Sequence, residues 1–168
     1  MGGTPLKEKS RSLIHAEETV DRLGFPIPEK PLTDPNDARV KWPSNVADLS
    51  PYQLAEHLSW WSGWSAYARY HVGAAETNVD NFDAAFKLDR DTRLYKSKGD
   101  YNTVTEALAA IVQSPDMVAL KQKLQRAKAV VIHLNALLAG YEEKYTTISR
   151  EISRRQLEFN SSKDRGRG

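Results

Sequence analysis

The sequence predicts an all-α fold: a long antiparallel, coiled-coil-like helical hairpin with a short helix in its connection, preceded by a proline-rich extended segment. Two long stripes of apolar residues support this prediction, one from Leu54 to Phe86 and one from Met117 to Phe159, each with alternating spacings of three and four. A short segment between them carries its own helix-start signal. Because the connection is short, the two long helices are expected to be antiparallel neighbours.

The second stripe is the more regular one, and only Arg155 interrupts its apolar and aromatic series. A spacing near 3.5 residues places such a series on one narrow face of a helix. A lone helix of this length cannot bury that face, so we expect it to pack against the first long helix. The members of the stripe are Met117, Leu120, Leu124, Ala127, Val131, Leu134, Leu138, Tyr141, Tyr145, Ile148, Ile152, Arg155 and Phe159.

Helix boundaries are marked by capping residues. Ser50-Pro51 followed by Gln53 predicts a capping box at the start of the first long helix, which we expect to continue to about Tyr95 and to end at Gly99-Asp100. Thr103 to Glu106 is a second capping box that opens the short helix, and Ser114-Pro115-Asp116 starts the last one.

The predicted organisation has three parts. Residues 1–48 form a short amphipathic helix that Gly24 ends, followed by a proline-rich extended arm, and residues 1–8 are expected to be disordered. Residues 49–159 form the hairpin core. Residues 160–168 form a basic, glycine-containing tail that is expected to be disordered.

Composition excludes several classes of protein. The chain has 168 residues, a formal net charge of +2 and no cysteine, so it has neither a disulfide framework nor thiolate chemistry. No apolar run approaches the roughly 20 residues of a membrane span, and the N-terminus has no signal-peptide pattern. We therefore expect no membrane association and a cytoplasmic location, in the host cell if a phage encodes the chain.

Catalytic and metal-binding patterns are missing from the sequence. The four histidines, His15, His57, His71 and His133, show no paired spacing for a metal, and no glycine-rich phosphate-binding loop is present. The sequence therefore predicts no enzyme, no cofactor and no metal site.

A basic stretch indicates nucleic-acid binding. The predicted hairpin brings cations at the end of the first long helix beside cations at the start of the last, with Tyr95 and Tyr101 among them. Basic groups that neutralise phosphates, with aromatic rings for stacking, are typical of single-strand binding. A charged, solvated helix end with Tyr95 packed inward is an equally open interpretation. The candidate residues are Lys87, Arg90, Arg93, Tyr95, Lys96, Lys98, Lys121, Lys123 and Arg126, with Lys128 beside them.

An aromatic face on the first long helix exceeds what one partner helix covers. Trp60, Trp61, Trp64 and Tyr67 lie on it, either as an oligomer interface or as core packing within one chain. Gly63, Gly73 and Gly140 are costly inside helices, and close helix–helix approach is one physical reason to keep them.

From about Leu49 to Arg155 this layout resembles the UvsY-type recombination mediators of tailed phages. The resemblance covers the aromatic first helix, the basic stretch Ala85-Phe86-Lys87 through Arg93-Leu94-Tyr95-Lys96, the Gly99-Asp100 turn and the last two helices. It implies a ring-like homo-oligomer that binds single-stranded DNA and loads a RecA-type recombinase onto strands covered by single-strand-binding protein. By resemblance, Lys87, Arg93 and Tyr95 fall in the DNA-contacting stretch.

The sequence thus leads to the hypothesis of a non-enzymatic, oligomeric single-stranded DNA-binding mediator of phage recombination or replication. The alternative is a coiled-coil scaffolding protein without nucleic-acid binding. A further alternative is a small adaptor that captures a partner through residues 25–48.

Overall fold

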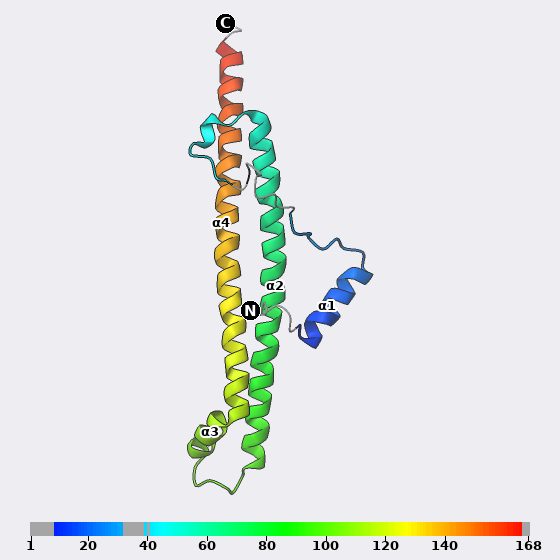
Figure 1. Cartoon of the computed structure of the whole chain (residues 1–168), viewed down its shortest axis with the longest axis vertical. Helices are drawn as coiled ribbons and strands as arrows, with labels where there is room; N and C mark the ends of the chain where they lie inside the picture. The colour runs from blue at the N-terminus through cyan, green and yellow to red at the C-terminus, as the bar shows by residue number, and fades with distance from the viewer. Residues whose placement is uncertain (1–8, 32–38, 40, 166–168) are drawn as a thin grey trace. The chain divides into compact units, whose positions relative to one another are not determined.

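A computed structural model describes residues 9–31, 39 and 41–165, with the backbone alone for residues 164 and 165. Its described residues form helices and no strand, which confirms the predicted all-α class (Figure 1). The two long helices are joined through a short helix, as predicted. The elements are α1 (Arg11–Arg22), a 3-10 turn η3 (Val46–Asp48), α2 (Pro51–Lys96), α3 (Val104–Gln113) and α4 (Pro115–Arg165).

Contacts within the chain divide it into two compact units. The first unit comprises Met1–Pro26 and His71–Leu134, and the second comprises Ile27–Tyr70 and Asn135–Gly168. Both long helices contribute to each unit, and within each unit a part of α2 lies antiparallel beside a part of α4.

The core of the first unit lies between α2, α3 and α4. Met117 is 0 % exposed and Ala75 is 3 % exposed, and Ile111 of α3 is also buried. Short α3 can bury Ala107 and Ile111 because they are four residues apart and so share one face. This face holds α3 against the long helices.

α1 packs against α2 in the same unit through a polar contact as well as through buried Leu13. The Ser10 backbone N–H donates to Asn78 Oδ1 at 3.2 Å, and Asn81 Nδ2 donates to Ser10 Oγ at 2.9 Å. Ser10 also caps α1 by accepting from the Leu13 N–H. The side chain of buried Asn78 thus has a hydrogen-bond partner at the start of α1, as buried polar groups generally do.

The core of the second unit is formed by α2, α4 and the proline-rich arm. Leu54, Trp60, Trp61 and Ile148 form the buried cluster. Val46 of the arm and Leu49 just after it pack on this cluster, together with Leu58, Trp64, Tyr141 and Ile152. The arm therefore supplies the third layer that the wide apolar face of α2 requires.

Arg155, the one charge in the stripe of α4, fastens this arm. Its Nη2 donates to the backbone carbonyl of Ala47 at 2.8 Å, and its Nε donates to Glu151 at 2.7 Å. Glu151 also binds Arg154, and hydrogen bonds from Arg154 and then Arg155 lower the pKa of Glu151 to about 2. Arg155 thus interrupts the apolar stripe because it makes a polar contact to the arm.

The predicted helix starts are confirmed. Gln53 N–H donates to Ser50 Oγ at 3.2 Å while the Ser50 N–H donates to Gln53 Oε1 at 2.9 Å, a complete capping box. At the start of α3 the cap is one-sided: Glu106 N–H donates to Thr103 Oγ1 at 3.1 Å, and the described residues show no return bond from the Thr103 N–H to the Glu106 side chain. Gly24 and Gly99 have φ of +74° and +98°, as turns after helices require.

The end of α4 differs from the prediction. Residues 160–165, which we expected in a disordered tail, continue the helix to Arg165. Apart from Asn160, Ser161 and Ser162 they are charged, and the segment has neither glycine nor proline to stop a helix before Gly166. The predicted disorder of residues 1–8 and 166–168 lies outside the described residues.

Close helix–helix approach does not explain the three helical glycines. A Cβ on Gly63 would lie 3.3 Å from Cγ of Pro31, so the arm rather than a helix approaches there. A Cβ on Gly73 or Gly140 would meet nothing within 4 Å. That part of the expectation is wrong, and these two positions have room for a larger residue.

Gly73→Ala is therefore expected to stabilise the protein by about 1 kcal/mol, because alanine loses less backbone entropy on folding and fills open space. Urea unfolding followed by circular dichroism measures this change. Gly63→Ala is the matched control and should gain less, since Pro31 must shift. Equal gains at both positions would contradict the account.

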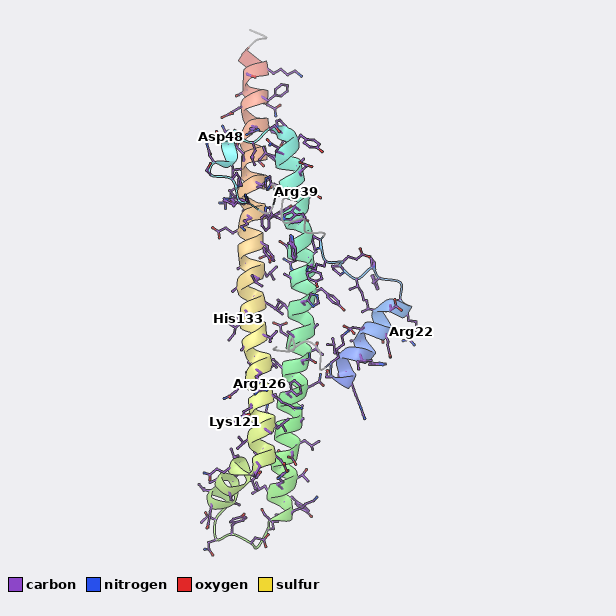
Figure 2. The ribbon with its side chains drawn as sticks, viewed as in Figure 1. Arg22, Arg39, Asp48, Lys121, Arg126 and His133 are labelled. Carbon is purple, nitrogen blue, oxygen red and sulfur yellow. The ribbon has the colours of Figure 1, made fainter. Side chains whose placement is uncertain are left out.

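His71 is expected to make stability depend on pH. It faces α1, and burial, opposed by Glu17, lowers its pKa below the ordinary 6.5. The folded chain therefore binds fewer protons than the unfolded chain, and stability falls as pH drops below about 6.5. His71→Gln should reduce this fall in thermal midpoint between neutral and mildly acidic pH. His133→Gln, at an exposed position on α4 (Figure 2), should leave it unchanged.

Candidate nucleic-acid interface

The candidate residues of the basic stretch all lie in the first unit, where Arg93 contacts both long helices. Its guanidinium binds Asp89 on α2 at 3.1 Å and reaches Asp116 at the start of α4 at 3.2 Å. Its Nη1 also donates to Ser114 Oγ at 3.4 Å. Hydrogen bonds to Asp89 and then to Asp116 raise the pKa of Arg93. Arg93 thus joins the end of α2 to the start of α4.

Two further candidates on α2 are paired with carboxylates. Lys87 lies 2.6 Å from Asp83, and Arg90 lies 2.7 Å from Asp91. The pKa of Asp83 is lowered by the Lys87 hydrogen bond and, to a smaller extent, by Lys128, which places Lys128 of α4 near this part of α2. The basic residues at the end of α2 and those at the start of α4 therefore lie near each other, but carboxylates lie among them.

The α4 candidates do not share one face. Residues advance by about 100° each around a helix, so Lys121 and Lys123 lie about 200° apart, on opposite sides of α4. Lys121 shares a side with Lys128, and Arg126 lies nearer to Lys123. Figure 2 marks Lys121 and Arg126 on α4. The predicted single basic surface is therefore divided between two flanks.

Some of the candidate cations have no ion-pair partner among the described residues. Among the residues that the structure describes, no ion pair reaches Lys96, Lys121 or Arg126, and all three are exposed. Lys123 takes part in an interaction within the chain. Lys98 Nζ lies 5.0 Å from the ring centroid of Tyr95.

The aromatic candidates lie at the end of α2, where Tyr95 is, and in the turn to α3, where Tyr101 is. Tyr95 is 73 % exposed, so it is not packed inward, and Tyr101 is 39 % exposed. Gly99 reverses the chain with its positive φ, and Thr103 caps α3 four residues later. The end of α2, the turn and the start of α3 line an open cavity of about 420 Å³. Its lining residues are Asp91, Leu94, Tyr95, Ser97, Lys98, Gly99, Tyr101, Asn102, Thr103, Val104 and Ala107.

The two tyrosines and Lys98 were predicted from the sequence, but the other residues of this cavity were not. Val104 and Ala107 belong to α3, and Asn102 belongs to the turn. The capping box at Thr103 was the available signal, because it places the first turn of α3 directly after Gly99-Asp100. Which face of α3 turns toward α2 depends on the packing of Ile111 and Ala107, and spacing alone did not show it.

The four residues proposed for an oligomer interface lie in the second unit, and the chain itself covers two of them. Trp60 and Trp61 are 7 % and 5 % exposed, whereas Trp64 and Tyr67 are half-buried. This burial favours the alternative of core packing within one chain. An oligomer interface through the four rings stays a prediction.

Two cations, one from α4 and one from the arm, and an aromatic ring of the arm cover these tryptophans. Trp42 packs edge-on against Trp61 with centroids 6.2 Å apart. Lys144 Nζ lies 4.0 Å from the Trp61 ring centroid, and Arg39 Cζ lies 4.8 Å from that of Trp60. Cation–π contacts of this kind let charged residues close an apolar face toward water.

Other site classes are not evident in the described part of the chain. It contains no group of three or more histidine or carboxylate side chains placed to hold a metal ion. None of its helices has an apolar run long enough to cross a bilayer. Comparison of the chain with protein-family models, with curated proteins and with solved structures gives no match.

Because Arg93 bridges two helices, Arg93→Gln is expected to destabilise the first unit as well as to remove a cation. The urea midpoint should fall, and hydrogen exchange should rise at the amides of residues 114–118. Arg126→Gln, which removes an exposed cation from α4, is the control and should leave both unchanged. An Arg93→Gln variant as stable as the control would contradict a structural role.

Proposed function

We propose that the chain is a non-enzymatic protein that binds single-stranded nucleic acid through the first unit, at the end of α2, the α2–α3 turn and the start of α4. Following the resemblance to the UvsY-type mediators, the ligand is single-stranded DNA. The corresponding task is that of an oligomeric recombination mediator acting with a RecA-type recombinase and a single-strand-binding protein.

One observation carries this proposal: exposed cations and an exposed aromatic ring lie together where α2 ends and the turn to α3 begins. Lys96 and Lys98 flank it, and Tyr95 is 73 % exposed. Ammonium groups neutralise phosphates, and an exposed ring offers a face for stacking. Favourable interaction with the C-terminal end of the α2 dipole accounts for the lysines alone. It does not account for an exposed tyrosine ring beside them.

A scaffolding protein is the second candidate, and a groove in the second unit favours it. The groove has a volume of about 550 Å³ between the start of α2 and α4, where Pro51, Leu54 and Ile152 line it. Phe159 also lines it and is 67 % exposed. Exposed apolar surface of this kind is typical of protein-binding sites.

Binding of a fluorescent single-stranded oligonucleotide at several salt concentrations tests the proposal, with duplex of equal length for comparison. We expect tighter binding of the single strand and a steep negative salt dependence. A variant with Lys96, Lys98 and Lys121 changed to alanine should bind more weakly. Its logarithmic salt slope should be shallower by about 0.7 for each phosphate that the variant no longer neutralises.

The control variant changes Lys41, Arg150 and Lys163 to alanine, three exposed cations of the second unit. It alters the net charge equally but leaves the proposed surface intact, so its slope should match that of the unchanged protein. Equal decreases in affinity in both variants would show attraction by net charge alone. Absence of binding at low salt would reject the proposal and leave the scaffold candidate.

A further inference from the structure

We infer that the cavity beside the α2–α3 turn receives one unpaired nucleobase, with the adjoining phosphate at Lys98. This inference rests on the proposed function and deepens it. It identifies where a base is held and why a duplex is a poorer ligand.

The walls of the cavity suit a flat, partly apolar group. Its volume of about 420 Å³ lies within the range of small-ligand sites, roughly 300–1,000 Å³. Leu94 and Val104 supply apolar surface, and the rings of Tyr101 and of Tyr95, over which Lys98 Nζ lies at 5.0 Å, supply faces on which a base can stack. A flat ring in the cavity would therefore contact both apolar side chains and aromatic rings.

Polar groups at the cavity suit the edge of a base. Ser97, Asn102 and Thr103 line it, and the Asn102 amide can both donate to and accept from base edges. Ser97 Oγ already donates to the Leu94 carbonyl at 3.2 Å, so it offers an acceptor. The Thr103 hydroxyl already accepts the Glu106 N–H, which leaves its own O–H as a donor. These groups offer hydrogen bonds of both polarities, so the cavity is compatible with more than one base.

The local charge is compatible with a phosphate beside this base. Lys98 lines the cavity, and Lys96 is exposed two residues earlier. The carboxylate that lines the cavity, Asp91, is paired with Arg90 at 2.7 Å, so its charge is offset. In a duplex the bases are stacked and paired inward, and placing one in the cavity would first require its extrusion, at a cost of a few kcal/mol. Single strands do not incur that cost in full.

An abasic oligonucleotide separates this inference from the proposed function, because it keeps the phosphates and lacks the bases. We expect an oligothymidylate to bind at least about fivefold more tightly than its abasic counterpart of equal length, the lower limit of what one stacked base contributes. Equal affinities would overturn the base cavity and leave phosphate binding intact. No binding of either oligonucleotide would overturn both.

A cavity-filling variant tests whether the preference for the oligothymidylate arises at this cavity. Val104 is 65 % exposed and lines the cavity, so Val104→Trp fills it without entering the core. The variant should lose the preference for the oligothymidylate and keep its affinity for the abasic strand. Val118→Trp, at an exposed valine of α4, is the control and should keep the preference. A preference that survives in Val104→Trp would overturn the assignment.

A second pair of variants tests the aromatic wall. Tyr95→Leu should reduce oligothymidylate affinity toward that of the abasic strand. Tyr52→Leu is closely matched, since both tyrosines are 73 % exposed and lie on α2, and it should have no effect. Circular dichroism establishes that every variant is folded. A folded Tyr95→Leu protein with unchanged affinity for both strands would count against stacking on this ring.

Discussion

The structure depends on burial of the apolar stripe of α4. In the first unit Met117 is 0 % exposed, and in the second unit Ile148 is also 0 % exposed. Each buried side chain of this size is stabilised by roughly 1.5–3 kcal/mol relative to exposure, which exceeds what helix propensity contributes at any position. Leu124 is also buried and most other members of the stripe are partly buried, whereas Tyr145 and Phe159 are exposed.

Where the apolar surface of α2 exceeds what α4 can cover, the chain supplies the remainder. In the second unit Val46 and Leu49 pack on the core cluster, and Trp42 packs against Trp61. Prolines in this arm prevent a third helix but allow an extended segment that follows a surface. Arg155 then holds the arm by a hydrogen bond to the Ala47 carbonyl. Trp60 and Trp61 are thereby buried within one chain, whereas Trp64 and Tyr67 stay half-buried.

The charges of the first unit fall into two groups with different physical roles. Arg93 is committed to Asp89 and Asp116, and Lys87 and Arg90 each have a neighbouring carboxylate. A bound phosphate would compete with these carboxylates. Lys96 and Lys98 lie beside a turn with exposed aromatic rings, where a polyanion meets less competition. The difference between these groups is the basis for choosing the turn rather than the whole basic stretch as the binding surface.

The helices and their starts could be predicted from the sequence, because capping boxes and 3-4 apolar spacing are local properties of the chain. Ser50 with Gln53 and Thr103 with Glu106 needed no tertiary information, and neither did the turn at Gly99. The covering of Trp60 and Trp61, the pairing of Arg93 and the cavity beside Tyr95 became evident only in the folded chain. These features depend on which helix faces pack against each other. Such contacts join residues that are distant in sequence, so they cannot be predicted from the spacing of residues within one helix.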